Sequence, residues 1–469
     1  MPFSDAIRIG AAGAGDYEIE RSLRFNHADS AYLVRTPSST GNEKVWTFSA
    51  WIKRTALGSL NYIYSLNNAN AEYVALYFQN DELYTYFHPG NNYGSVSGRK
   101  FRDLGAWFHI VHQVDALNTT QKIWINGTEM SLDSNRNPSN SDFGMNQAGV
   151  DLYIGKASWK SNYNDMYLAE AYLSDGNKYQ ASDFAETNSK TNQWVPKKFI
   201  GSYGTNGFHL KFLDNSGTTA TTLGKDSSGN SNNFTPNNFS VAAGEGNDSV
   251  TDTPTNNFCT LNPLDSSGNV PSNGNLQGGT AGTSGWRHTR STIALPSSGK
   301  WYWEFKVPDA SADGSNGWIT GMAYSNLSLT QDINADSTGL YGRQTQNKYL
   351  NSSTNPEDTD FTSVSNNDIL QYAYDADGQK LYTGKNNTWE ESANPSAGSN
   401  PNWTSVASGG FPMVGSYGSS RYVLLNCGQQ GFVYTPPTGF KALSSANLPD
   451  PSIKLPNKHF DTLLWTGDG

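Results

Sequence analysis

Five aromatic side chains lie in polar stretches rich in Asn, Ser, Gly or Pro, where a flat ring could contact a partner. They are Trp159, Tyr163, Tyr341, Trp389 and Trp403. Sugar rings stack on flat aromatic faces, while amide and hydroxyl groups nearby fix the sugar hydroxyls. The alternative is structural, because a Trp in a polar loop often only covers the edge of a sheet. We therefore predict contacts to a glycan or a protein at some of these rings, with that alternative open for each.

Two loops that begin with aspartate contain the oxygen donors that Ca²⁺ prefers. Asp214 begins the string DNSG, and Asp226 begins the string DSSGN. Carboxylate and carbonyl oxygens bind calcium, so each loop could supply ligands. The same residues also form Asx-turns, in which the side chain bonds to the backbone of its own loop. Neither string has the spacing of a complete calcium loop, so we favour turns, keep Ca²⁺ as the alternative and expect no other cofactor.

Motifs for bond-breaking chemistry are absent from the sequence. It contains no nucleophile elbow and no phosphate-binding Gly loop that ends in Lys-Ser/Thr. His109 and His112 lie three apart in an alternating stretch, so they should point to opposite faces of a strand and cannot chelate one metal. We expect one of them to pack near Trp107. Glu304 has no carboxylate partner on its strand, and we expect it at an exposed position or paired with a neighbouring Lys. These observations predict a protein that is not an enzyme.

The charge balance and the cysteines argue against several classes of protein. Asp and Glu number 42 against 32 Lys and Arg, which gives a formal net charge of −10. Such a chain repels DNA and anionic membrane surfaces, so we expect no nucleic-acid and no membrane partner. Cys259 and Cys427 are too few for a disulfide framework or a zinc set. Two free thiols are the favoured interpretation, and one bridge between them is the alternative.

Alternating apolar and polar residues predict β-strands throughout the chain. The string WTFSAWIKR places Trp46 and Ile52 on one face, and KWYWEFKV places Trp301 and Val307 on one face. The dipeptides Asn126-Gly127 and Asp377-Gly378 lie between such runs and predict hairpin turns. No stretch has a long helical period. Short strands and tight turns, without helices between them, predict an all-β protein of antiparallel sandwiches.

Changes in composition divide the chain into five parts. Residues 201–285 are rich in Gly, Asn, Ser and Thr, with sparse apolar residues that we expect to anchor this stretch on the domain surfaces. The predicted parts are an N-terminal anchoring arm at 1–20, a β-sandwich at 21–200, a connector at 201–285, a second β-sandwich at 286–443 and a tail at 444–469.

Two family resemblances refine the fold prediction. The ordered strings SLRFNHADSAYL, WTFSAWIKR, WFHIVHQVD, KIWINGTEM and LYIGK resemble a laminin-G-like domain, a jelly roll of the concanavalin type. The strings KWYWEFKV, DILQYAYDADGQKLYTGKNNTW and RYVLLNCGQQGFVYTPPTGFKAL resemble a SPRY domain, which is another concanavalin-like sandwich. Enzymes of this fold that resemble laminarinases carry Glu-x-Asp-x-x-Glu on one strand, as paired-carboxylate cleavage requires. That motif is missing, so the resemblance implies binding rather than glycan cleavage.

The chain contains DSSGNSNNFTPNNFSVAAGEGNDSVTDTPTNNFCTLNPL between the two domains and GDYEIERSLRFN near its start. Both strings are similar to those of tail-fibre-like structural proteins of marine phages, including cyanophages. In addition, the N-terminus lacks the basic start and apolar core of a secretory signal. The resemblance implies a virion protein, namely a tail fibre, a spike or a capsid decoration, that contacts other virion proteins and a host-surface glycan or protein. It also implies a homo-oligomer, with a trimer favoured. The alternatives are a free carbohydrate-binding module and, third, a polysaccharide depolymerase.

Overall fold

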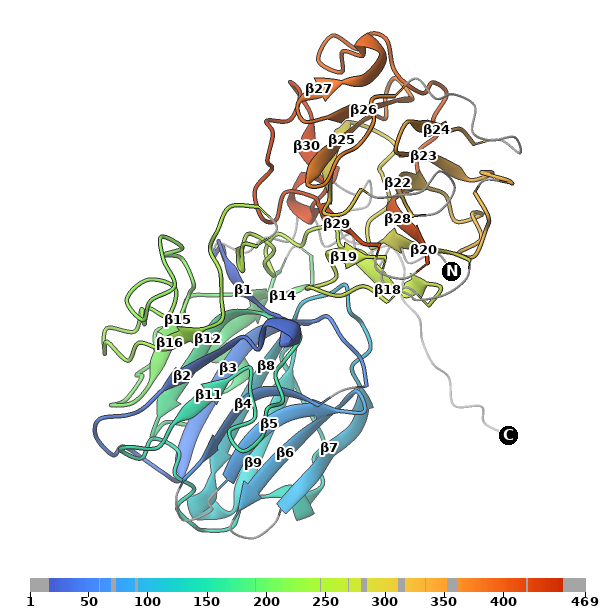
Figure 1. Cartoon of the computed structure of the whole chain (residues 1–469). Coiled ribbons are helices and arrows are strands. Elements are labelled where there is room, and N and C mark those ends of the chain that lie inside the picture. The colour runs from blue at the N-terminus through green and yellow to red at the C-terminus, as the bar shows by residue number, and fades with distance from the viewer. Residues whose placement is uncertain are drawn as a thin grey trace, which may run out of the picture.

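Two β-sandwiches follow one another along the chain (Figure 1), so the prediction of an all-β fold is confirmed. The computed structural model describes residues 17–449 except 59, 69–72, 89–91, 190, 245, 269, 280–284, 311–316, 334, 352–360 and 419–420. Most of the predicted arm and most of the predicted tail therefore lie outside the described residues. In the described part of the chain, no helix is long and apolar enough to cross a membrane.

The first sandwich consists of two facing antiparallel sheets. The eight-stranded sheet runs in the order β10 (Thr128–Glu129), β9 (Thr120–Ile125), β8 (Phe108–Asp115), β3 (Val45–Arg54), β12 (Met166–Asp175), β1 (Ser22–Phe25) and β17 (Ser249–Val250), with β15 (Phe208–Leu210) beside β12. The seven-stranded sheet runs in the order β16 (Thr235–Asn237), β2 (Tyr32–Arg35), β11 (Leu152–Ile154), β4 (Asn61–Asn67), β5 (Tyr73–Gln79), β6 (Glu82–His88) and β7 (Asn92–Lys100). A small sheet pairs β13 (Ala185–Thr187) with β14 (Trp194–Pro196).

The second sandwich repeats this plan with shorter strands. Its six-stranded sheet runs in the order β18 (Leu261–Ser266), β20 (Trp286–Ser291), β28 (Phe411–Tyr417), β22 (Trp318–Ala323), β23 (Leu340–Gln344) and β24 (Asn347–Tyr349). Its seven-stranded sheet runs in the order β19 (Gln277–Gly278), β29 (Val423–Asn426), β21 (Lys300–Val307), β25 (Asp368–Asp375), β26 (Lys380–Lys385) and β27 (Thr388–Trp389), with β30 (Lys441–Ala442) parallel to β21.

Helical structure among the described residues is limited to single turns. The α-helix α1 spans Ala181–Phe184. Turns of 3₁₀ helix span His27–Asp29, Ala116–Asn118, Ser134–Arg136, Glu390–Ser392 and Ser445–Asn447. Short turns of this kind connect strands and cannot form a helical layer, so side chains of the facing sheets form the hydrophobic cores.

The predicted alternation holds in the central strands, but both faces of these strands are buried. Trp46 and Ile52 of β3 lie in the first core, and Trp301 and Val307 of β21 lie in the second. The outer face of β3 is also covered, because Thr47 donates to the Asn177 carbonyl and accepts from the Tyr179 N–H. A chain segment from far along the sequence thus covers polar positions that alternation alone would leave in solvent.

Both predicted hairpin turns are present. Asn126 and Gly127 connect β9 to β10 with positive φ angles of 47° and 80°, which a two-residue turn of this type requires. The second turn contains four residues, because Asp375 pairs with Lys380. Its positive φ falls on Gln379 rather than on the glycine, so the Asp-Gly dipeptide located this hairpin but not its turn geometry.

The segment predicted as a connector supplies strands and core residues to both sandwiches. Its strands β15, β16 and β17 pair in the first sandwich, and β18 and β19 pair in the second. Phe234 and Phe239 belong to the first core, and Leu261 belongs to the second. The sparse apolar residues therefore act as anchors, and most of the described stretch is an integral part of the two folds.

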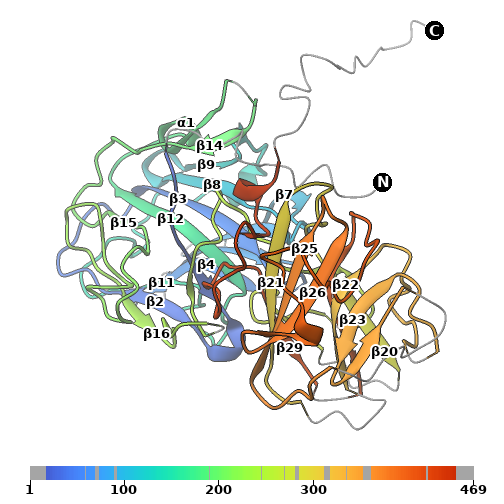
Figure 2. The ribbon, with the colours of Figure 1, turned by 90° about the horizontal axis from the view of Figure 1, so that it is seen from above.

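The two sandwiches contact each other directly, as Figure 2 shows from above. The Tyr167 hydroxyl of β12 donates to the Gly274 carbonyl at 2.7 Å. The Thr251 N–H, just after β17, donates to the Gln429 carbonyl of the second sandwich at 2.9 Å. These two bonds pair polar groups that the contact buries, so burying them costs little.

Candidate functional site

The outer face of the seven-stranded sheet in the first sandwich is rich in aromatic side chains. In β5, Val74 and Leu76 point into the core, so the alternating positions point outward. The outward aromatic residues of three adjacent strands are Tyr62 of β4, Tyr73 and Tyr77 of β5, and Tyr84, Tyr86 and His88 of β6. Most of them are only half-buried, so this face presents rings to solvent.

The loop that follows β11 docks on this face where two small side chains leave room. Ser65 and Ala75 are direct neighbours across β4 and β5. The Ser65 hydroxyl donates to the Lys156 carbonyl at 2.7 Å and accepts from the Ser158 N–H at 2.8 Å. The sheet itself thus holds the loop, and the next residue, Trp159, is placed over the tyrosines.

Trp159 meets three tyrosines edge to face. Its ring centroid lies 5.6 Å from Tyr62, 5.2 Å from Tyr73 and 5.8 Å from Tyr86. Tyr62 in turn stacks on Tyr77 at 4.9 Å, and burial raises the pKa of Tyr62 to about 12. Aromatic pairs in these geometries stabilise one another beyond simple burial. Trp159 remains half-buried, so this cluster, here called the aromatic platform, has an orderly and partly exposed surface.

Tyr163 lies at the other end of the same face. Lys156 Nζ lies 4.4 Å from the ring centroid of Tyr32, 5.1 Å from that of Tyr153 and 5.7 Å from that of Tyr163. Such cation–π contacts hold the ammonium group against the rings. Two of the five predicted contact residues, Trp159 and Tyr163, are therefore brought to one face by one loop.

A hollow of about 380 Å³ adjoins the platform. It is lined by Asn67, Asn68, Gln147, Ala148, Gly149, Val150, Asp151, Tyr153 and Ser158. Within the described part of the chain, the Asn68 amide donates to Gln147 Oε1 at 3.1 Å across this hollow. Amides and hydroxyls beside flat rings form the arrangement that binds sugars. These amides and the platform tyrosines were not predicted from the sequence, although the alternating aromatic residues of YVALYFQ and ELYTYFH were a usable signal.

The other three predicted contact residues lie in the second sandwich, away from this face. Tyr341 is 7% exposed and packs in the core beside Tyr324. Trp403 is 2% exposed, and its Nε1 donates to the Tyr349 carbonyl. Neither ring is open to a partner, so the prediction of a surface contact is corrected for both, and the structural alternative explains them. Trp389 is half-buried against a small cluster that includes Tyr302.

The two aspartates considered for calcium are bound by donors of their own surroundings. Asp214 accepts from the N–H and the hydroxyl of Ser216. Asp226 accepts from the N–H groups of His209, Ser228 and Asn232 and from the Ser228 hydroxyl. These contacts are those of the turn interpretation. Across the described ranges, no group of three or more His, Cys, Asp or Glu side chains is placed to hold a metal ion.

The two histidines point to opposite faces of β8, as predicted. His112 faces the core, where its Nδ1 lies 2.8 Å from the Tyr64 hydroxyl. His109 faces outward, stacks on Trp51 at 5.0 Å and accepts from Trp194 Nε1. Trp107 packs in the same cluster as these two tryptophans. Cys259 and Cys427 are buried free thiols, which is the favoured of the two interpretations.

Glu304 is 1% exposed, which corrects the prediction of an exposed position or a Lys pair. Its carboxylate accepts from the N–H groups of Val433 and Tyr434, each at 2.9 Å, and from the Tyr302 hydroxyl. Burial is the main cause that raises its pKa. The two N–H groups tie the loop at residues 433–434 to β21, so this acid has a structural role.

Glu304→Gln should therefore destabilise the second sandwich. The introduced amide group would face a backbone N–H that now has an acceptor, and an unsatisfied buried donor costs about 1–3 kcal/mol. Thermal unfolding followed by near-UV circular dichroism would show a lower melting temperature. Glu129→Gln is the control, because that side chain is 48% exposed. An unchanged melting temperature for Glu304→Gln would contradict the anchoring role.

Residues 28–181 match a protein family described as the concanavalin A-like lectin/glucanases superfamily (Laminin_G_3). The matched residues include most strands of the platform sheet. They form about a third of the chain, so the match shows the fold of the first sandwich. No curated protein matches the sequence.

Several solved structures are similar to parts of the chain. The SPRY domain of human HERC1 has 18% identity and a TM-score of 0.28, over 35% of this chain and 96% of its own. A heptameric SAP-like pentraxin from Limulus polyphemus has 16% identity and a TM-score of 0.27, over 34% of this chain and 77% of its own. Domains LG4-5 of the mouse laminin alpha1 chain have 12% identity and a TM-score of 0.30, over 92% and 98%. At these levels of similarity, none of them carries a function over to this chain.

Proposed function

We propose that this protein binds carbohydrate without cleaving it, and that its glycan site is the aromatic platform with the adjoining hollow. The observation that carries the proposal is the placement of Trp159 over Tyr73 and Tyr86, beside a hollow lined by amides. A pyranose ring has flat C–H faces and a rim of hydroxyls. It therefore matches a partly exposed aromatic surface that has hydrogen-bonding groups at its edge.

The charges around the platform favour an uncharged glycan. Asp151 accepts from the Thr36 and Tyr153 hydroxyls, so its negative charge is partly satisfied within the protein. Lys156 holds its ammonium group against Tyr32 and its neighbours. With both charges engaged inside the protein, recognition rests on ring stacking and on the neutral amides that line the hollow, which suit an uncharged sugar. Each such contact is weak, and several copies of the chain on one surface would multiply the affinity through avidity.

Trp159→Ala tests this proposal. A glycan array of the full chain would identify a bound sugar, and titration calorimetry would then measure its affinity. We expect the substitution to weaken binding at least about tenfold, which corresponds to roughly 1.4 kcal/mol. Trp389→Ala is the matched control, because that Trp is also half-buried but lies in the second sandwich. Absence of glycan binding by the unmodified chain, or equal affinity of the Trp159 variant, would refute the proposal.

The biological setting that we propose is adhesion or assembly on a bacteriophage particle, as a tail fibre, a spike or a decoration. The support is the resemblance of the sequence to phage structural proteins, together with a glycan site that suits a host surface. A trimer suits a fibre or a spike and is part of the same proposal. Locating the protein in purified particles tests the setting, and its absence from them would refute it. Release of oligosaccharides from a host polymer would instead favour a depolymerase.

A further inference from the structure

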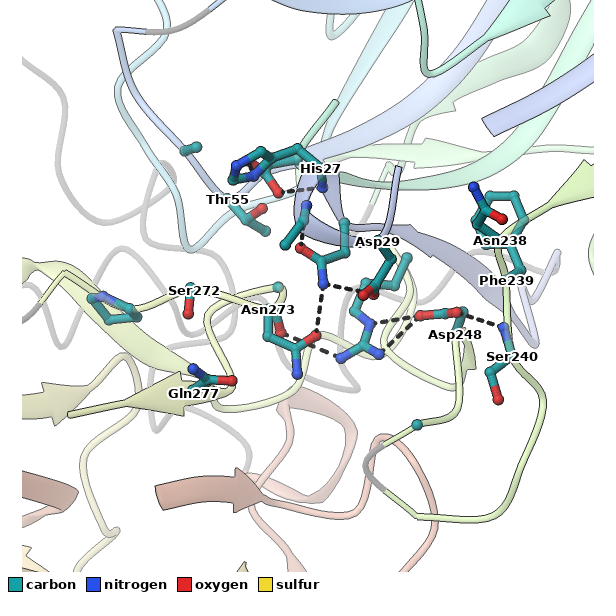
Figure 3. A pocket seen from close by; sticks show the side chains of 18 of the residues that line it. His27, Asp29, Thr55, Asn238, Phe239, Ser240, Asp248, Ser272, Asn273 and Gln277 are labelled. Carbon is teal, nitrogen blue, oxygen red and sulfur yellow. Dashed lines mark hydrogen bonds and ion pairs between the residues drawn. The ribbon is translucent and has the colours of Figure 1, made fainter. Parts of the chain in front are cut away.

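A larger cavity lies between the two sandwiches, away from the aromatic platform (Figure 3). Its volume is about 890 Å³, which lies in the range of small-molecule sites, and such sites often occur between domains. The first sandwich contributes residues 24, 26–29, 55–56 and 165 to its wall, and the following segments contribute residues 238–240, 246, 248, 270–274 and 277. In Figure 3, Ser272, Asn273 and Gln277 line one side, and Phe239, Ser240 and Asp248 line the other.

The wall of this cavity is held in place by a buried ion pair. Arg24 donates through Nε and Nη2 to Asp248 Oδ1 at 3.0 and 2.8 Å, and its Nη1 donates to the Asn273 carbonyl at 3.3 Å. The Asn26 amide donates to Asp29 Oδ2 at 2.7 Å and to Asn273 Oδ1 at 3.4 Å. Residues of both sides are thereby joined, and a ligand would meet a preorganised wall, which lowers the entropic cost of binding.

The charges of the wall select against anions. The Arg24 guanidinium is neutralised by Asp248, and His27 Nδ1 lies 2.7 Å from Asp165 Oδ2. Asp29 adds a further carboxylate, so the lining has more acidic than basic side chains. A sulfate, a phosphate or a uronic acid would find no uncompensated positive charge among these lining residues and would be repelled by the carboxylates.

The remaining lining groups suit a ligand with many hydroxyls. The neutral polar side chains are Thr55, Asn238, Ser240, Ser272, Asn273 and Gln277. The side chain of Gln277 makes no hydrogen bond within the described part of the chain, so its amide is free to bond a ligand. Apolar surface from Phe239, Pro271 and Val270 lies beside these groups, and Val270 is 63% exposed. Neutral donors and acceptors next to small apolar patches match the two faces of a sugar ring.

We infer that this cavity is a second saccharide site, specific for a neutral glycan unit and shared by the two sandwiches. It is independent of the platform, since no residue lines both hollows. A ligand held by Asp29 on one side and Gln277 on the other contacts both sandwiches at once. The expected consequence is that a bound neutral glycan stabilises the two sandwiches together.

Photo-crosslinking of the full chain locates the site directly. The probe is a neutral β-linked glucose trisaccharide that carries a diazirine, with a sulfated version of the same trisaccharide as the control. Peptide mapping by mass spectrometry should find the neutral probe on residues 26–29, 238–240 or 270–277, also in the Trp159→Ala variant. The sulfated probe should label these residues at least about tenfold less. A triple variant adds Gln277→Ala and Asp29→Ala to Trp159→Ala. In this variant, labelling of the cavity by the neutral probe should fall about tenfold.

The outcomes separate this inference from the proposed function. Labelling restricted to residues 147–159 and to strands β5 and β6 would overturn the second site and support the platform. Labelling of the cavity alone would support the second site and count against the platform. Labelling at neither place would overturn both. Equal labelling of the cavity by the sulfated probe would overturn the specificity for neutral glycans.

Discussion

Asp252→Ala should lower the free energy of unfolding by about 3–5 kcal/mol, the usual cost of leaving one partner of a buried ion pair unpaired. Asp252 lies in the crossover, residues 251–260, which joins β17 of the first sandwich to β18 of the second. Its Oδ2 is 2.9 Å from Lys53 Nζ of β3. Both side chains have 0% exposure. Without the carboxylate, the Lys53 ammonium would keep one amide acceptor, Asn257 Oδ1, in a site closed to water.

The contacts of Asp252 explain why the effect should reach both sandwiches. Its Oδ1 accepts from Trp107 Nε1 at 2.9 Å, and its carbonyl accepts from the Ser22 hydroxyl. The following residues Phe258 and Cys259 pair with the strand end at residues 443–444 of the second sandwich. Loss of this anchor should therefore loosen the crossover, and differential scanning calorimetry should show a lower and broader transition than for the unmodified chain.

A control and a double substitution make this prediction specific. Lys122→Met removes an exposed pair on β9 and β10, whose side chains are 50% and 48% exposed, and should change stability by less than about 0.5 kcal/mol. Lys53→Met combined with Asp252→Leu removes both charges and should recover a large part of the loss, because it leaves no unpaired ion. A loss for Asp252→Ala as small as that for Lys122→Met would show that the buried pair does not hold the crossover.

The sequence predicted what depends on near neighbours in the chain. The alternation in β3 and β21 is a local pattern, so the inward side chains could be identified without knowledge of the rest of the fold. The burial of the outward side chains could not be predicted from this local pattern. Glu304 is buried because the loop at 433–434 folds over β21, and that loop lies about 130 residues later in the chain. Long-range cover of this kind leaves no periodic signal in the strand itself.

The candidate site was predictable only in part for the same reason. Trp159 stands out in the sequence because it is aromatic within a polar loop, and Trp403 stands out for the same reason. In the structure the two residues differ. Trp403 forms a β-bridge with Leu381 and lies in the core, whereas Trp159 docks on an outer face. That face exists because Ser65 and Ala75 are small and adjacent on two strands. Cross-strand register decides this adjacency, and the sequence does not display it.

Acidification from pH 7 to 4.5 should destabilise the protein before most carboxylates titrate. The reason is that three buried histidines stay neutral in the folded protein but become protonated in the unfolded chain. Burial lowers the pKa of His109 to about 3 and the pKa values of His112 and His288 to about 4, from an ordinary value near 6.5. The unfolded chain therefore binds more protons than the folded chain between about pH 6.5 and 4. Stability falls as the pH falls through this window, by roughly 2–3 kcal/mol per histidine at pH 4.5.

The surroundings of these histidines explain the direction of the shifts. His112 lies between the Tyr64 hydroxyl and Gln121 Oε1 in the first core, each at 2.8 Å. His288 stacks on Trp286 and bonds the Gln331 carbonyl at 2.9 Å. Neither ring has a carboxylate as its hydrogen-bond partner, so a proton added inside the fold would be buried without compensation. The contribution of Glu304 to the pH dependence of stability has the opposite sign, because its raised pKa favours the folded chain as the pH falls.

Proton uptake on unfolding isolates the contribution of each histidine. Calorimetric unfolding at pH 5.5 in buffers with different ionisation enthalpies counts the protons bound, and each buried histidine should add about one. His112→Gln and His288→Gln retain a polar side chain that cannot titrate, so each should reduce the uptake by about one proton and flatten the pH dependence. The substitutions also cost hydrogen bonds, but that loss does not vary with pH. The slope therefore reports the histidine itself, and an unchanged slope in both variants would mean that these rings accept protons inside the folded protein.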